Sequence, residues 1–200
     1  MSLREKKKTE TKNKIFKVSG RLFKEKGFEK TTVDEITKKA GIAKGTFFNY
    51  FSTKEALLLY FGEQKEELIY GLIENETMKG IPTKKKITNF LVFLAESVEK
   101  DKELTKLMVF EYTRYMVHSG LGPCEDKCRL HRLTETLFGL LDEGVKIGDV
   151  KTSFDVYKAS EIITGVYLHS LIMWLNSEDK ISFSNEISGK IDMLFEGIGV

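Results

Sequence analysis

The sequence contains few of the residues that interrupt or cross-link a fold. Its 200 residues include two prolines and two cysteines, Cys124 and Cys128, which lie too close together to build a disulfide framework. An apolar signal segment at the start and an uninterrupted apolar run of 18 residues are also lacking. We therefore expect a cytoplasmic protein without transmembrane helices, long enough to bury its own core.

Apolar residues recur at helical spacing along almost the whole chain, and no segment has the pattern of a strand. The first helix is expected to begin near Thr11, after a frayed polar start. Thr32 with Glu35, and Ser52 with Glu55, have the spacing of capping boxes. The pattern predicts an all-α protein with nine helices, at about 11–26, 33–40, 42–51, 53–78, 83–100, 102–118, 124–147, 153–176 and 184–198.

Charge is distributed unevenly along the chain. Residues 1–54 hold 15 Lys and Arg against 6 Asp and Glu, whereas residues 55–200 hold 17 against 24. Such a basic front suggests a polyanionic partner, although a solvated lysine-rich helix face would give the same count. Lys6, Lys7, Lys8, Lys12 and Lys14 would then form either a DNA-contacting arm or a disordered tail.

Two short helices joined by a tight turn at Gly41 have the spacing of a helix-turn-helix. The flanking residues make this signal specific, and over about residues 10–60 they resemble the TetR family of repressors. The resemblance is carried by Gly27-Phe28, Thr31-Thr-Val-Asp-Glu-Ile36, Ala40-Gly-Ile-Ala-Lys-Gly-Thr-Phe-Phe-Asn-Tyr-Phe51 and Lys54-Glu55-Ala-Leu57.

The resemblance implies a three-helix DNA-binding domain, residues 1–52, followed by a six-helix ligand-binding and dimerisation domain, residues 53–200. It places Lys44, Gly45 and Phe48 at base edges, where lysine can donate to guanine and an aromatic ring can contact a thymine methyl. It assigns phosphate contacts to Thr32, Thr46, Tyr50 and Lys54.

Some of these residues also have structural interpretations, and two depart from the family pattern. Phe47 and Phe51 are expected in the core of the small domain, and Thr32 would cap its helix in any case. Ala43 stands where the family usually has serine, so a hydroxyl is missing at the start of the recognition helix. Phe48 replaces a common tyrosine and also lacks a hydroxyl.

The segment from Ile162 to Leu175 is apolar on nearly all sides, so it must be covered on several of them. The resemblance implies that this helix and the last one form a four-helix bundle with a second copy of the chain, giving a homodimer on a near-palindromic site. The predicted dimer contacts are Ile162, Val166, His169, Met173, Ile187, Ile191, Leu194 and Phe195.

Large apolar and aromatic residues of the middle helices are candidates for the lining of a small-molecule pocket, although most would serve equally well as core. They are Phe90, Leu94, Met108, Glu111, Tyr112, Tyr115, Met116, Phe138 and Tyr167. Glu111 lies on an apolar helix face, where a carboxylate needs a partner. That partner is either a cationic ligand or Arg114.

Other functions have weaker support. Cys124, Cys128 and His131 could share one helix face and act as a thiol sensor or offer three ligands to a soft metal. Three of four ligands do not make a site, so we expect no metal and no cofactor. An enzyme is disfavoured because no nucleophile–base pair or phosphate loop is present. A membrane-surface role for the first helix competes with its need to cover the core. We expect a DNA-binding regulator, a homodimeric repressor released by a small hydrophobic or amphipathic ligand, or else a ligand-independent module of the same fold.

Overall fold

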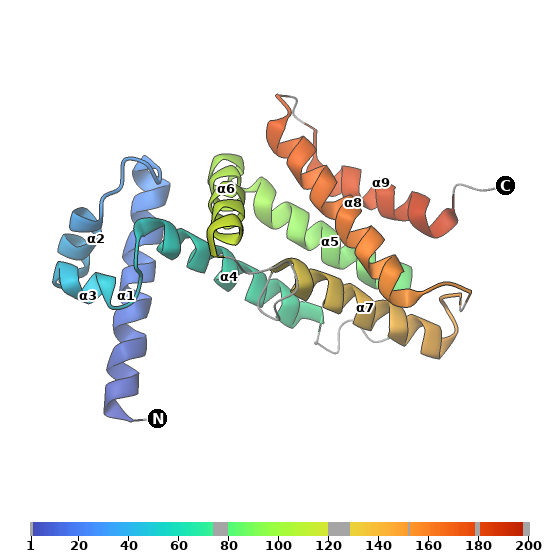
Figure 1. Cartoon of the computed structure of the whole chain (residues 1–200), viewed down its shortest axis with the longest axis horizontal. Helices are drawn as coiled ribbons and strands as arrows, with labels where there is room; N and C mark the ends of the chain where they lie inside the picture. The colour runs from blue at the N-terminus through green and yellow to red at the C-terminus, as the bar shows by residue number, and fades with distance from the viewer. Residues whose placement is uncertain (1, 74–79, 120–128, 152, 179–180, 198–200) are drawn as a thin grey trace. The chain divides into compact units, whose positions relative to one another are not determined.

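The computed structural model describes residues 2–73, 80–119, 129–151, 153–178 and 181–197, and its regular structure there is entirely helical (Figure 1). The helices are α1 (Leu3–Lys26), α2 (Val33–Ala40), α3 (Lys44–Phe48), α4 (Lys54–Ile73), α5 (Thr83–Glu99), α6 (Lys102–Ser119), α7 (Arg129–Ile147), α8 (Val156–Asn176) and α9 (Phe183–Glu196). This confirms the all-α prediction and its nine helices. The chain divides into two compact units, Met1–Gln64 and Lys65–Val200.

Helix α1 begins eight residues earlier than its apolar stripe indicated, and the prediction of a frayed start was wrong. Ser2 accepts a 3.2 Å hydrogen bond from the amide of Glu5, and the Glu5 carboxylate accepts one of 2.6 Å from the Ser2 amide. This capping box satisfies two amides that would otherwise lack partners at the helix start. The basic residues of the proposed arm therefore belong to a helix.

The two predicted capping boxes form only in part. Thr32 accepts from the Glu35 amide at 3.2 Å, but the Glu35 side chain forms an ion pair with Lys26 of α1 instead of reaching back. At α4 the cap shifts by one residue, because Thr53, not Ser52, accepts from the amide of Ala56 at 3.0 Å. A lysine on a neighbouring helix offers Glu35 a charged partner, which a backbone amide does not.

In the first unit, α1 packs against α2 and α2 against α3. The apolar stripe of α1 contributes Ile15 and Leu22, both with almost no exposed surface, and α2 contributes Ile36 and Ala40. The start of α4 adds Leu57 and Leu58, which are also fully buried. A small helical unit is thus held together around the two short helices of the helix-turn-helix.

In the second unit, four helices close a ring of contacts: α5 with α7, α7 with α8, α8 with α9, and α9 with α5. Helix α6 packs against α5 and α8. The buried core of this unit includes Phe90, Leu91, Leu137, Tyr167, Trp174, Phe183, Ile187 and Ile191. Each helix of the ring therefore contributes one apolar face to a core formed within the same chain.

Two carboxylates fasten helix starts in this ring from a distance along the chain. Asp149 accepts hydrogen bonds of 2.7 Å from both the amide and the hydroxyl of Thr83, at the start of α5. Glu99 accepts bonds of 3.1 Å from the amide and hydroxyl of Ser184, at the start of α9. The orphan amides of these helix ends are thus satisfied by tertiary contacts.

Among the described residues, no helix combines the length and apolar character that crossing a bilayer requires.

Candidate nucleic-acid interface

Helix α3 separates its adjacent aromatic residues between the core and the solvent. Phe47 is fully buried, whereas Phe48 exposes 45% of its surface. Phe51, one turn further on, is buried against Phe47, with ring centroids 5.9 Å apart. The core assignments of Phe47 and Phe51 are confirmed, and the solvent-facing side of α3 presents Lys44, Gly45 and Phe48 together.

The start of α3 lacks a side-chain cap, as the sequence predicted. Ala43 is the N-cap residue and no side chain bonds to the free amides that follow it. At Gly45 a Cβ atom would meet nothing within 4 Å, so the backbone of α3 is open to close approach here. Amides at a helix start are suited to phosphate, which makes this end of α3 chemically competent to approach DNA.

Lys44 is paired across the turn of the motif. Its Nζ lies 2.7 Å from Oδ1 of Asp34, and the two side chains remain 57% and 71% exposed. Asp34 was not predicted as a partner of Lys44, although an acidic residue in so basic a segment was a usable signal. The side chain expected to read bases is therefore held by an exposed carboxylate.

The candidate phosphate contacts lie in the same unit but in different environments. Thr32 is exposed and accepts the capping hydrogen bond of α2, while Thr46 and Tyr50 are half-buried. Lys54 donates a 2.9 Å hydrogen bond to the carbonyl oxygen of Phe28. Since an ammonium carries three donors, this bond leaves Lys54 capacity for a further acceptor.

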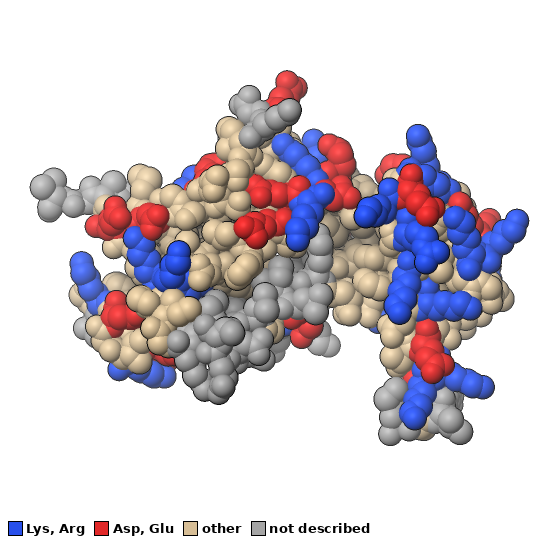
Figure 2. All heavy atoms as spheres, turned by 180° about the vertical axis from the view of Figure 1, so that it is seen from behind, with Lys and Arg blue, Asp and Glu red and all other residues tan. Residues whose placement is uncertain are grey.

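Lysine and arginine side chains gather over the first unit, on the right in Figure 2. Lys12 of α1 is half-buried, and its Nζ lies 3.8 Å from the ring centroid of Tyr60 and 5.7 Å from that of Phe51. Such placement over aromatic faces is favourable for a cation. Lys12 thus ties α1 to the start of α4.

The pocket candidates are spread over α5 to α8. Phe90, Leu94, Met108 and Tyr167 are buried, while Tyr112 and Phe138 are half-buried; the side chains of Tyr115 and Met116 lie outside the described residues. Phe90, Leu94 and Tyr167 belong to the packed core, the alternative that the sequence left open. The ring of Phe138 lies 5.8 Å from that of Tyr157.

Glu111 is buried, and its carboxylate lies 2.6 Å from the guanidinium of Arg114, one turn along α6. This ion pair is the structural alternative to a cationic ligand. Cys124 and Cys128 lie outside the described residues, and His131 lies 4.0 Å from Glu135. Within the described residues no three potential ligands gather around a metal position.

The predicted dimer contacts divide between the core and an open face. Ile187 and Ile191 are fully buried in the ring of the second unit, so their assignment to a partner chain was wrong: α9 turns that stripe towards α5. Val166, Leu194 and Phe195 are partly buried against the same core. Ile162 and Met173 are exposed, at 57% and 56%, and His169 is exposed as well.

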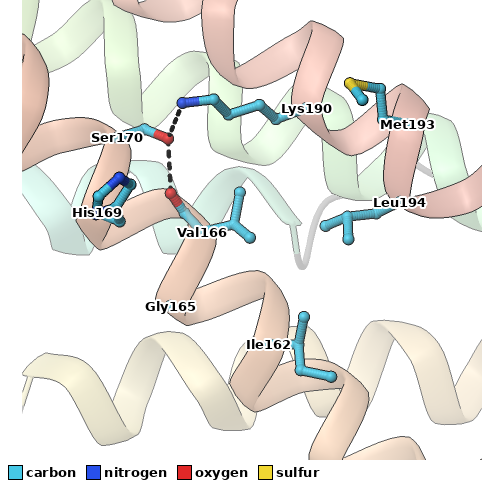
Figure 3. A pocket seen from close by; sticks show the side chains of 8 residues that line it. All are labelled: Ile162, Gly165, Val166, His169, Ser170, Lys190, Met193 and Leu194. Atoms are coloured by element: carbon cyan, nitrogen blue, oxygen red, sulfur yellow. Dashed lines mark hydrogen bonds between the residues drawn. The ribbon is translucent and has the colours of Figure 1, made fainter. Parts of the chain in front are cut away.

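The open face of α8 and α9 carries a groove (Figure 3). Lys190 donates to the Ser170 hydroxyl at 2.8 Å, and Ser170 in turn donates to the Val166 carbonyl at 2.7 Å. The groove is otherwise apolar, and its lining consists of Ile162, Gly165, Val166, His169, Ser170, Lys190, Met193 and Leu194.

Comparison with known proteins agrees with this geometry. Residues 15–61 match the family model "Bacterial regulatory proteins, tetR family". The chain is 24% identical to the fatty acid metabolism regulator protein of Bacillus subtilis, over 87% of this chain and 88% of the relative. It is 25% identical to the transcriptional repressor KstR2 of Rhodococcus jostii, over 74% and 72% of the two chains.

Solved structures share the whole fold. FadR of Thermus thermophilus, a TetR-family repressor in complex with lauroyl-CoA, aligns over 94% of this chain and 95% of its own, with a TM-score of 0.72 and 23% identity. FadR of Bacillus subtilis, in complex with stearoyl-CoA, aligns over 93% and 98%, with a TM-score of 0.61 and 21% identity. The helix-turn-helix and the match over residues 15–61 show that the chain carries a DNA-binding domain of the TetR family, and the solved structures share its fold.

Proposed function

We propose that the chain is a homodimeric repressor that binds a near-palindromic operator and leaves it when an amphipathic ligand binds. The head, residues 1–52, presents α3 to the major groove, with Lys44, Gly45 and Phe48 at base edges. Thr32, Thr46, Tyr50 and Lys54 contact phosphates. The observation that carries this assignment is the exposed ring of Phe48 beside the fully buried ring of Phe47, because an apolar ring in water gains from a thymine methyl.

The DNA-reading roles are tested by selecting preferred duplexes from a random library and measuring their affinity over a salt series. Lys44→Ala is expected to lower the affinity of the preferred duplex about tenfold and to erase its preference over a shuffled one. Tyr50→Phe should weaken both duplexes alike, since a phosphate contact carries no sequence information. Equal effects of the two variants on both duplexes would contradict the base-reading role of Lys44.

The dimer is supported by the exposed apolar residues of α8 and α9. Ile162 and Met193, which line the groove of Figure 3, expose more than half of their surface, and so does Met173 of α8. A Cβ atom at Gly165 would meet nothing within 4 Å, so a second helix can approach closely. A two-fold axis through this face would pair two heads for the two halves of a palindrome.

Light scattering of a charged variant at this face tests the dimer. Ile162→Glu is expected to give monomers and to lower operator affinity by at least tenfold. Dimerisation would bury the new carboxylate at the interface without a partner, and the cost of removing it from water opposes association. Ile147→Glu is the matched control, since Ile147 is an equally exposed isoleucine, on α7. If both variants remain dimeric, the partner contacts lie elsewhere.

The ligand we propose is a long-chain acyl-CoA. Support comes from the structurally similar FadR proteins, which were solved with lauroyl-CoA and stearoyl-CoA. Phe90, Leu94, Met108 and Tyr167 of α5, α6 and α8 are buried apolar residues that would have to separate to contact an acyl chain. A ligand that binds more tightly to the dimer when the spacing of its two heads does not fit the operator shifts the population away from the DNA-binding form.

The ligand is tested by titrating the protein–operator complex with lauroyl-CoA and stearoyl-CoA. The fluorescence anisotropy of the labelled DNA reports its release. We expect release of the DNA at micromolar thioester, and no release by free CoA or by a detergent of equal chain length. Release by the detergent as well would indicate unspecific disruption. No release by either thioester would favour the ligand-independent alternative.

A further inference from the structure

Asp34 and Lys44 form an ion pair that spans the turn of the helix-turn-helix. Asp34 is the second residue of α2 and Lys44 is the first residue of α3, with 2.7 Å between Oδ1 and Nζ. The first turn of α2 carries the partial positive charge of the helix end, so an acidic residue is well placed there. The Lys44 ammonium therefore already has an anionic partner before DNA arrives.

The exposure of the pair makes it exchangeable. Both side chains keep more than half of their surface in water, and exposed ion pairs contribute little to stability, about 0–1 kcal/mol. A nucleic-acid acceptor can therefore replace Asp34 at Lys44. What replaces it best depends on geometry, because guanine offers two acceptors, O6 and N7, to one lysine.

Asp34 also penalises binding that does not use Lys44. Its carboxylate lies on the side of α2 that faces the start of α3, so phosphates approaching α3 come within the range of its charge. On a sequence without a suitable base acceptor, Lys44 stays with Asp34 and adds nothing to the affinity. When unspecific DNA binds, the Lys44 ammonium is therefore not available for a contact.

We propose that Asp34 is a specificity-determining residue, which withholds Lys44 from unspecific DNA and releases it only to a matching base edge. This inference rests on the proposed role of Lys44 in base reading. Asp34 itself contacts no base; it acts through Lys44. Its effect should therefore appear in the ratio of two affinities and vanish when Lys44 is absent.

The test compares affinities for the preferred duplex and a shuffled duplex at several salt concentrations. Asp34→Asn is expected to tighten binding of the shuffled duplex about threefold to tenfold and that of the preferred duplex less than twofold. Asp34→Glu, which keeps the charge, should preserve most of the discrimination. In a Lys44→Ala background, Asp34→Asn should no longer change the ratio of the two affinities.

Glu25→Gln is the matched control, because Glu25 forms a comparably exposed ion pair, 3.6 Å from Lys39, in the same unit. It removes one negative charge without touching Lys44, and it should shift both duplexes by one common factor. If Asp34→Asn behaves like Glu25→Gln, or keeps its effect on the ratio without Lys44, the inference is overturned. A wild-type chain that shows no preference between duplexes would overturn the proposed function as well.

Discussion

The ammonium of Lys54 donates a 2.9 Å hydrogen bond to the carbonyl oxygen of Phe28 and lies 4.0 Å from the centroid of the same residue's ring. The first residue of α4 thus fastens the turn between α1 and α2. The proposed phosphate contact of Lys54 would use an ammonium that the fold already holds in position. Its substitution should consequently affect stability as well as DNA binding.

Lys54→Met is expected to lower the free energy of unfolding of the first unit by about 1–2 kcal/mol, because the Phe28 carbonyl loses its donor and the ring its cation. Faster hydrogen exchange at the amides of α2 would report this loss. If Lys54 also contacts a phosphate, the salt dependence of operator binding should decrease by about one ion. Lys38→Met, at an exposed lysine of α2, is the control and should leave exchange unchanged.

Ala43→Ser should stabilise the recognition helix. The start of α3 has no side-chain hydrogen bond, and serine is a much better N-cap than alanine. We expect the free energy of unfolding of the first unit to rise by about 0.5–2 kcal/mol, measured by chemical denaturation followed by circular dichroism. Ala43→Val supplies no acceptor, and a stabilisation by valine of the same size would show that capping is not the cause.

Gly144→Ala should destabilise the second unit, although alanine favours helices. A Cβ atom there would press on the Thr83 hydroxyl and lie 2.6 Å from Cγ2 of Val150, within the contact that fastens α5. We expect the free energy of unfolding to fall by about 1–3 kcal/mol. Unfolding can be measured by the fluorescence of Trp174, which lies in this unit.

Gly139→Ala, on the same helix, is the control for helix propensity. A Cβ atom at Gly139 would meet nothing within 4 Å. This substitution should raise the free energy of unfolding by about 0.5–1 kcal/mol. Similar changes for the two glycines would show that the space around Gly144 is not restricted.

The N-cap of α8 should give stability a defined pH dependence. The hydrogen bond from the Lys158 amide, with help from the Lys158 charge and the Tyr157 amide, lowers the pKa of Asp155 below its ordinary value of 3.8. A carboxyl whose pKa is lowered by folding contributes stability above its unfolded pKa and loses it as the pH falls through its folded pKa. The Tm advantage over Asp155→Asn should therefore be complete above the unfolded-state pKa of 3.8 and be lost progressively as the pH falls below it. An advantage that is constant with pH would contradict the ionised cap.

Local signals in the sequence were enough to predict the helices and the helix-turn-helix. The apolar spacing of α1, the cap at Thr32 and the turn at Gly41 depend on residues a few positions apart, so they could be recognised without a structure. The same holds for Phe47 and Phe48, because the motif places one towards the core and the other away from it. These features depend on interactions between residues that are close along the chain, so the sequence pattern is enough to predict them.

Only the tertiary structure decided which neighbour each apolar stripe or charged side chain contacts. The stripe of Ile187 and Ile191 looked equally suited to a partner chain, and only the packing of α9 on α5 turned it inward. Lys44 met Asp34, and Glu35 met Lys26, because separate helices brought opposite charges together. A sequence pattern specifies that a residue is apolar or charged; the element that covers it or pairs with it is set by packing among helices that are distant along the chain.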